Sequence, residues 1–380
     1  MKLTMNCEAY VSSVLQGAIS TNEFNQVLSN SGVNTLVVLS NSQALPVSEL
    51  SPVISSAGAK NLLLKIDCTR ASQSQAVQII NSSTGQNTSL ELGSLTSFTA
   101  QGVTAVIQAL GNKKCTVEVN GTSSSQVQAV HLISSVKSTN TSIRVSSIGA
   151  MPSSAVSAVV QALGSRAFTA SIDAAVTSIS SIINVFNVTT NSNATLSLDN
   201  ADAIGANGIS QAIQAIGNRK LSIGLNAGGI TPSNLQNIIS SAGGNISFSV
   251  ANIQNYGTNE IAAIINSAGT KTLSVSLDGL SSLPIQIQQA VSAGKPATTI
   301  SVNTANNQQL SVMLDAVNAS GNTNFTATYN SAQLVVTPTD GNYVVRVLQV
   351  AKPSTSVILA PVGVGTFRWD LLLDIMNAAG

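Results

Sequence analysis

Charged and aromatic side chains are scarce in this sequence, and their scarcity limits what the protein can do. Charged residues make up 8% of the 380 residues and aromatic residues 3%, while 16 Lys and Arg nearly balance 15 Asp and Glu. A net charge of +1 gives no general attraction to nucleic acid or to an anionic membrane, so neither partner is expected. The 43% of apolar residues recur periodically, which indicates a folded core rather than disorder.

Cysteine and long apolar runs are also rare. Cys7, Cys68 and Cys115 are too few and too scattered for a disulfide framework, and Cys115 is expected to be a buried free thiol. No stretch approaches the roughly 18 apolar residues that indicate a transmembrane helix. Asn6, Cys7 and Glu8 interrupt any apolar run near the N-terminus, so no Sec signal peptide is predicted. Localisation stays open between the cytoplasm and export by a Sec-independent route, as for a bacterial effector.

What the sequence does contain is one pattern that repeats about every 26 residues, the signature of a solenoid. Each unit reads as an alternating strand, a Ser/Asn/Gly turn, a helix and a closing glycine. In residues 269–294, apolar residues and serines alternate over 273–277, and Pro284 begins a helix that Gly294 is expected to end in the left-handed conformation. Neighbouring units close in the same way, on Gly111, Gly217 and Gly269.

A strand that always follows one helix must run parallel to the strand before it, with a right-handed crossover. Strands pack about 4.8 Å apart and helices about 8–10 Å apart, so the chain must curve with its strands inside. The sequence predicts an α/β fold, a curved right-handed solenoid of about 13 strand–helix repeats with the parallel sheet inside and the helices outside. Small helix residues favour a gentle arc. One continuous domain is expected, with an N-terminal capping repeat at 1–34, regular repeats at 35–330 and divergent C-terminal repeats or a cap at 331–380.

Strand cores such as Leu90-Glu91-Leu92, together with helical segments such as 208–216, resemble the ribonuclease-inhibitor-like branch of the leucine-rich repeats. The resemblance covers about residues 35–330 as a pattern. It implies a protein-interaction scaffold and nothing narrower. The family's Asn, three residues after the second strand leucine, is missing here. An Asp or Asn instead follows many strands directly, at Asp67, Asn120, Asp173, Asp199, Asn226, Asp278, Asn303 and Asn330.

This Asx column is interpreted as a set of turns in which each side chain bonds its own backbone, with a calcium site as the alternative. Other chemistry is sparse. His131 is the only histidine, and no motif ties it to an Asp, Cys or Ser. Phosphate-binding loops, His/Cys metal spacing and nucleophile motifs are not found in the sequence. The sequence therefore predicts no enzyme, no cofactor and no metal site.

The inward side of the strands divides into two zones. Lys65, Glu91, Glu118 and Arg144 form a charged column and are the candidate partner-binding residues, with mutual cross-strand ion pairs as the alternative. The later strands present almost only Ser and Thr, which could meet a glycan, another β-surface or ice. Basic residues just after helix ends are expected to interact with helix C-termini, with an anionic polymer as the alternative. They are Lys60, Lys113, Lys114, Arg166, Arg219, Lys220, Lys271 and Lys295.

Two functions follow from this pattern. The leading hypothesis is a non-enzymatic protein-interaction scaffold that binds a partner protein on the sheet face. The alternative is a self-assembling structural protein that forms end-to-end filaments or a surface layer, because residues 3–6 read as a strand at one end and residues 367–376 as a helix at the other. Both hypotheses use repeat surfaces rather than chemistry.

Overall fold

In the computed structural model, residues 2–6, 25–26, 28–29, 35–57, 61–85, 87–305, 310–320, 323–329 and 338–359 are described. Strands and helices alternate along them, as the repeat predicts. The strands are β1 (Lys2–Asn6), β2 (Thr35–Leu39), β3 (Asn61–Asp67), β4 (Thr88–Gly93), β5 (Cys115–Asn120), β6 (Thr141–Ser146), β7 (Phe168–Asp173), β8 (Ala194–Asp199), β9 (Leu221–Asn226), β10 (Ile246–Ala251), β11 (Leu273–Asp278), β12 (Thr298–Ala305), β13 (Asn324–Tyr329) and β14 (Thr355–Leu359). The longer helices are α3 (Val47–Ala57), α4 (Gln73–Ser82), α5 (Ala100–Leu110), α6 (Gln126–Ser135), α7 (Ser153–Leu163), α8 (Ile179–Val188), α9 (Gly205–Ile216), α10 (Pro232–Ser241), α11 (Thr258–Ser267), α12 (Pro284–Ala293), α13 (Leu310–Ala319) and α15 (Pro338–Val350).

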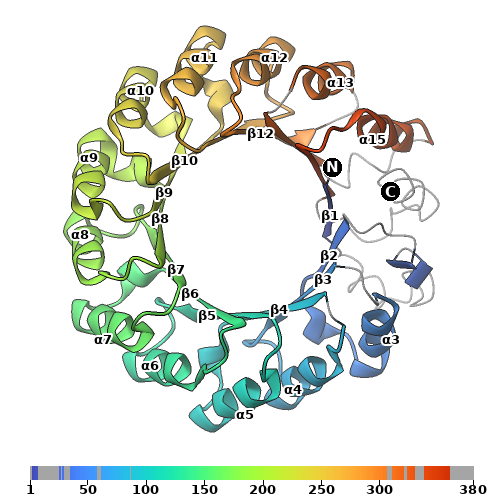
Figure 1. The fold of residues 1–380 in the computed structure, drawn as a ribbon, viewed down its shortest axis with the longest axis vertical. Helices are drawn as coiled ribbons and strands as arrows, with labels where there is room; N and C mark the ends of the chain where they lie inside the picture. The colour runs from blue at the N-terminus through green and yellow to red at the C-terminus, as the bar shows by residue number, and fades with distance from the viewer. Residues whose placement is uncertain are drawn as a thin grey trace.

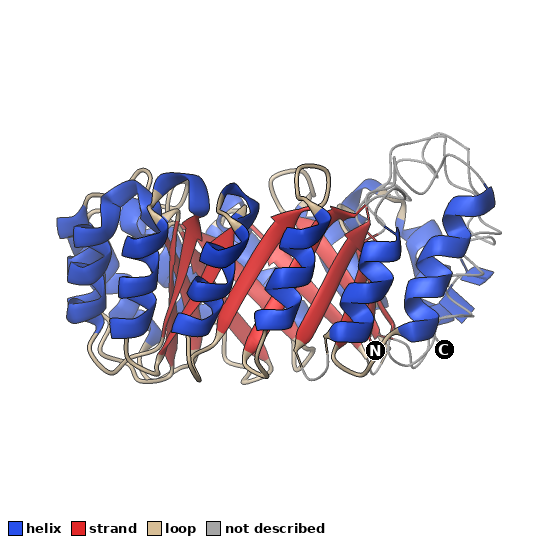
Figure 2. Ribbon diagram, turned by 90° about the horizontal axis from the view of Figure 1, so that it is seen from above, coloured by secondary structure: helices blue, strands red, loops and turns tan. Residues whose placement is uncertain are grey.

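The strands form one parallel sheet that closes on itself (Figure 1). Every strand pairs with its sequence neighbours, and β1 closes the ring because it pairs with β14 on one edge and with β2 on the other. Leu3, for example, lies opposite both Val357 and Thr35. The helices surround the sheet, and the strands tilt relative to the ring axis (Figure 2). The curved α/β solenoid with its parallel sheet inside and its helices outside is therefore confirmed.

The predicted gentle arc is wrong, because the curvature carries the sheet through a full turn. The difference in spacing between strands and helices acts at every coil, and strand tilt lets the last strand meet the first. The strand expected at residues 3–6 is confirmed as β1, but both of its edges are paired, so it offers no free edge for end-to-end stacking. The helix expected at 367–376 lies outside the described residues, and the three domain boundaries stay predictions.

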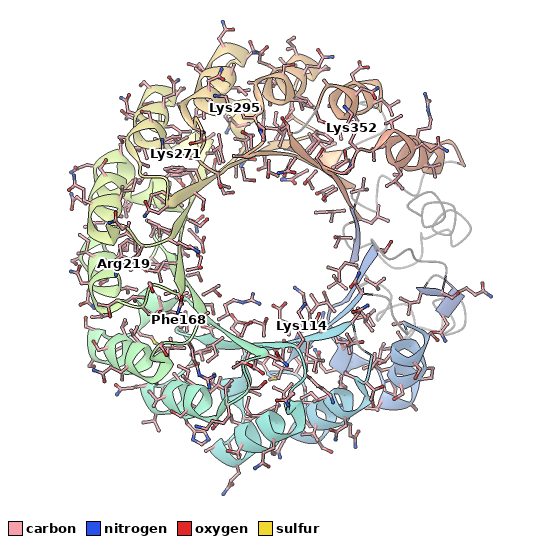
Figure 3. All side chains as sticks on the ribbon, viewed as in Figure 1. Lys114, Phe168, Arg219, Lys271, Lys295 and Lys352 are labelled. Atoms are coloured by element: carbon pink, nitrogen blue, oxygen red, sulfur yellow. The ribbon has the colours of Figure 1, made fainter. Side chains whose placement is uncertain are left out.

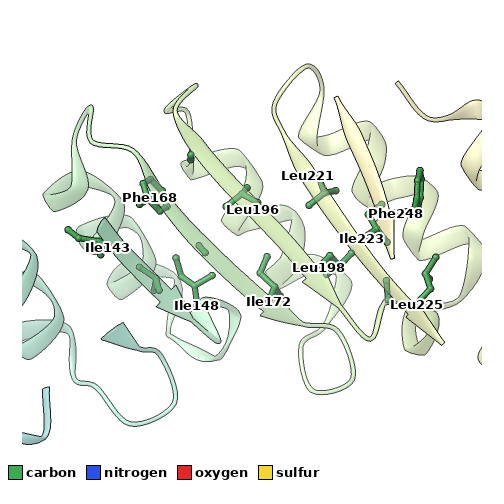
Figure 4. Packing of buried hydrophobic residues seen from close by; sticks show 14 of the residues in the cluster. Ile143, Ile148, Phe168, Ile172, Leu196, Leu198, Leu221, Ile223, Leu225 and Phe248 are labelled. Carbon is green, nitrogen blue, oxygen red and sulfur yellow. The ribbon is translucent and has the colours of Figure 1, made fainter. Parts of the chain in front are cut away.

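The hydrophobic core fills the layer between the sheet and the helices. On β3, Leu62, Leu64 and Ile66 are buried, whereas Leu63 and Lys65 are half-buried and face the centre of the ring. Figure 4 shows the same alternation along the later strands, whose outward side chains pack together from coil to coil. Because side chains of a strand alternate between its two faces, this core leaves the other face of every strand for the centre.

Two kinds of coil alternate from β2 to β11, so the structural repeat over these coils is about 53 residues rather than about 26. In one kind, which we call the αL coil, a left-handed residue follows the strand and leads into a short 3-10 turn. These residues are Asn41, Ser94, Ser147, Asn200 and Asn252. In the other kind, the Asx coil, the last strand residue accepts a bond from the amide two residues later. These residues are Asp67, Asn120, Asp173, Asn226 and Asp278.

Helix ends follow the same alternation. Gly111, Gly217 and Gly269 close αL coils with positive φ of 50°, 61° and 59°, but ψ of −118° at Gly111 and −127° at Gly217 places these two outside the left-handed helical region predicted for them. Gly294 closes an Asx coil with φ of −60°, so the left-handed cap predicted there is wrong. A Cβ at Gly294 would lie 2.6 Å from Cγ2 of Thr323, and close packing between coils explains this glycine instead. Pro284 begins α12, as predicted.

Candidate functional site: the inner face of the ring

The inner face consists of the strand side chains that point to the centre of the ring (Figure 3). Its side chains are largely half-buried or exposed, as at Ser142, Thr195 and Ser249, while their neighbours along each strand are buried. A packed centre would bury both sets, so the ring surrounds an open lumen. Fourteen strands at about 4.8 Å give a backbone diameter of roughly 20–25 Å, which leaves roughly 10–15 Å between opposing side chains.

The four charged candidates lie on adjacent strands of this face, but they do not pair in sequence order. Lys65 on β3 lies opposite Glu91 on β4, with 3.4 Å between Nζ and Oε2. Arg144 on β6 lies opposite Glu118 on β5, yet its guanidinium bonds the other oxygen of Glu91 at 2.7 Å. Glu91 therefore holds two cations at once. This network confirms the ion-pair interpretation for three of the four residues.

Glu118 is the exception in the charged column. Its carboxylate forms no ion pair or hydrogen bond with any residue that the structure describes. A Cβ placed on Gly93 of β4 would lie 3.5 Å from its Oε2, so the missing side chain at Gly93 gives this carboxylate room. Glu118 is half-buried in the lumen wall. Of the two carboxylates in this column, it is the one without an ion pair among the described residues.

Hydroxyl side chains line the lumen on the later strands, as the sequence predicts. Serines lie opposite one another at Ser171 and Ser197 and again at Ser276 and Ser301. These side chains are half-buried rather than packed. This hydroxyl zone provides uncharged hydrogen-bonding groups along the strands, while Asp173 and Asp199 lie where two of these strands end.

A third zone, which the sequence analysis missed, is apolar. This zone lies on the inner face, with Leu36 and Val38 on β2 and Ile358 on β14, the two strands that border β1, and Leu63 on the next strand, β3. Val38 is 7% exposed but lies outside the core cluster, and it is paired with Leu63 across the sheet. The sequence places Leu36, Val38 and Leu63 on this face, but only the closure of the ring brings Ile358 near them, with Thr4 of β1 between Ile358 and Leu36.

The Asx column lies at the rim where the strands end. Asp67 Oδ1 accepts from the Thr69 amide at 2.9 Å, and Asp278 Oδ1 accepts from the Leu280 amide at 3.2 Å. These bonds confirm the turn interpretation for the Asx coils. Asp199 differs because it ends the strand of an αL coil, directly before the left-handed Asn200. Partial burial raises the pKa of its carboxyl, to which the charge of nearby Asp173 adds, while a bond from Ser197 opposes the shift.

Side chains also bind neighbouring coils to one another at both rims, and they replace the amide ladder that the resemblance would place elsewhere. At the rim of strand ends, Gln43 Oε1 accepts from the Asp67 amide at 3.1 Å and Gln254 Oε1 from the Asp278 amide at 3.2 Å. At the opposite rim, Asn140 Nδ2 donates to the Asn112 carbonyl at 2.9 Å. These bonds join an αL coil to an Asx coil.

The basic residues act on helix ends where the structure shows their contacts. Arg219 donates to the carbonyls of Ile216 and Ala215 at 2.9 Å each, and to those of Phe186 and Thr189. Lys271, which follows α11, donates to the Ser240 carbonyl near the end of α10, and Lys295, which follows α12, donates to the Asn266 carbonyl near the end of α11. For these three residues the helix C-terminus interpretation is confirmed, since a cation there offsets the negative end of the helix dipole. Lys60 lies outside the described residues.

The groups that could carry catalysis are held in structural roles. Cys68 and Cys115 are buried and free, as expected for Cys115; burial, with a smaller effect of Asp67, raises the pKa of the Cys68 thiol from 9.0 to about 12. Cys7 lies outside the described residues. His131 on α6 donates through Nε2 to the Ala100 carbonyl at 3.1 Å. Within the described part of the chain, no group of three or more His, Cys, Asp or Glu is placed to hold a metal ion.

Searches against known proteins give little beyond this geometry. No protein-family model matches the chain, and no curated protein matches it. The yeast Rad7 and Elc1 complex contains a chain with 13% identity and a TM-score of 0.43, over 91% of this chain and 90% of that one. A Rhizobium etli pyruvate carboxylase has 11% identity and a TM-score of 0.26, over 71% of this chain and 26% of that one. At these values neither likeness bears on function.

No helix in the described ranges is long and apolar enough to span a bilayer.

Proposed function

We propose that this protein is a non-enzymatic interaction scaffold that binds a partner protein on the inner face of its ring. One observation carries the proposal: Lys65, Glu91, Glu118 and Arg144 form a charged cluster on adjacent strands of the lumen wall, beside a zone lined by Ser and Thr. Charges that only kept the protein in solution would gain nothing from this position. Repeat proteins commonly bind on the concave face of their coils. The ribonuclease-inhibitor-like branch stays a prediction.

The test compares partner capture by matched charge reversals. Glu118→Lys changes the lumen, whereas Asp315→Lys changes an exposed carboxylate on the outer helix α13. Quantitative mass spectrometry after affinity capture should identify a protein that the wild type and Asp315→Lys retain and that Glu118→Lys loses. A partner retained equally by both variants, or lost equally from both, would contradict binding at the inner face.

Self-assembly is the rival function. Because β1 is paired on both edges, end-to-end growth would have to use surfaces other than a free strand. Light scattering over a concentration series separates the two functions, since growth in particle size with concentration is expected only for the rival. A particle of one constant mass supports the scaffold.

A further inference from the structure

The lumen joins two features that a partner must satisfy together. Near β1 its wall is apolar, at Leu36, Val38 and Leu63. Lys65 follows Leu63 on the same face of β3. With its partner Glu91 on β4, it forms the edge of the charged cluster next to the apolar zone. Apolar and charged surface are thus continuous across adjacent strands. A ligand that covers both must itself be amphipathic.

The charged column is neutral overall, with two cations and two carboxylates, but its ion pairs leave one carboxylate without a cation. Glu91 neutralises part of the charge of Lys65 and Arg144, with one carboxylate oxygen directed to each. Glu118 keeps an unpaired carboxylate in a half-buried position, where water screens it less than at an open surface. A carboxylate in such a place is satisfied best by an ammonium or guanidinium group, which donates charge-assisted hydrogen bonds.

The closed ring also limits the ligand's thickness. An open arc would admit a globular domain, but the lumen leaves roughly 10–15 Å between opposing side chains. A single α-helix with its side chains is about 10–12 Å across, whereas two packed helices need roughly 8–10 Å more. The lumen therefore fits one helix.

We propose that the ring receives one amphipathic, basic α-helix of a partner protein, with its apolar side against Leu36, Val38 and Leu63 and a cationic side chain on Glu118. This proposal rests on the proposed function, which it narrows from a partner protein to a helical segment. The hydroxyl zone on the opposite wall provides groups that can hydrogen-bond the polar side of the helix. Glu118 gives specificity and the apolar zone contributes binding energy through burial.

The test uses synthetic helical peptides of about 18 residues, or roughly 27 Å, labelled for fluorescence anisotropy. One peptide has a leucine stripe and an arginine beside it, and its matched control has citrulline in place of the arginine. The wild-type protein should bind the arginine peptide roughly tenfold more tightly than the citrulline peptide, because one charge-assisted bond is lost. Glu118→Gln should abolish this difference, while Asp315→Asn on the outer surface should preserve it.

Leu63→Thr gives a second, independent test of peptide binding, since it replaces an apolar side chain of the lumen wall with a hydroxyl side chain like those of the hydroxyl zone. It should weaken both peptides by a similar factor and leave the arginine preference intact. The inference is overturned if neither peptide binds, if Glu118→Gln leaves the preference unchanged, or if a proline-interrupted peptide binds as well as the helical one. The capture experiment above can still succeed in each of these cases, so failure of the helix proposal is distinct from failure of the scaffold.

Discussion

Closure of the ring depends on β1, and a single proline should open it. The register pairs four residues of β1 with β14 and four with β2, which gives roughly eight backbone bonds. At about 0.5–1.5 kcal/mol net each, these bonds contribute roughly 4–12 kcal/mol. Ordering the five residues of β1 costs roughly 5–10 kcal/mol. The two contributions are of similar size, so the loss of one or two bonds can reverse closure.

Thr4 lies in the middle of β1, with a paired strand on each side. A proline there removes a ladder donor and is not tolerated inside a sheet. Thr4→Pro should thus release β1, so that β14 and β2, which lie two strand spacings or about 9.6 Å apart across it, are no longer held at this separation. Thr4→Val keeps the backbone donor and is the matched control.

Spin labels can measure the opening. Ser48 on α3 and Gln349 on α15 are exposed and lie on the helices that flank the seam (Figure 1). With Cys7 replaced by serine and labels attached to cysteines at these two positions, Thr4→Pro should lengthen and broaden the distance distribution by at least about 5 Å, one strand spacing. Small-angle scattering should show a larger maximum dimension. A Thr4→Pro distribution that superposes on that of Thr4→Val would refute the reasoning.

Two further predictions concern stability. Arg219→Met should lower the free energy of unfolding in urea by about 1–3 kcal/mol, because four helix-end carbonyls lose a charged donor, and Arg219→Lys should cost less; equal stability of all three proteins would contradict this role. Burial raises the pKa of Cys68 from 9.0 and of Tyr256 from 10.0, each to about 12, so the native state favours their neutral forms. Their contribution to the free energy of unfolding is complete below about pH 9 and is lost as the pH rises toward 12. The urea midpoint should therefore fall over this range, and it should fall less steeply in Cys68→Ala and Tyr256→Phe. A wild-type midpoint that does not change over this range would argue against burial.

The repeat made most of the local structure predictable, while longer-range features were not. Apolar alternation such as that of 273–277 determines which face of a strand is buried, and one helix between strands determines that they run parallel. Closure depends on small rotations that add up over all coils, and no single residue signals it. Arg144 lies opposite Glu118 but forms its ion pair with Glu91. This choice depends on strand tilt and side-chain length, which the spacing of residues in the sequence does not show.

The alternation of coils was hidden for a different reason. Serine and asparagine occur near the strand ends of both αL coils and Asx coils. Ser94 and Asn120 therefore look alike in the sequence, although only Ser94 is left-handed. The spacing of Lys113, Arg166, Arg219 and Lys271, about 53 residues, was the signal that could have revealed it.

Alternation also has a consequence for the circumference of the ring. The Gln43 and Gln254 side chains each reach from an αL coil to the following Asx coil. Removing one coil would set two coils of the same kind side by side and leave such an amide facing the wrong backbone. Rings built from this chain's coils should therefore change size only in steps of two strands, and their bore should take discrete values rather than a continuous range.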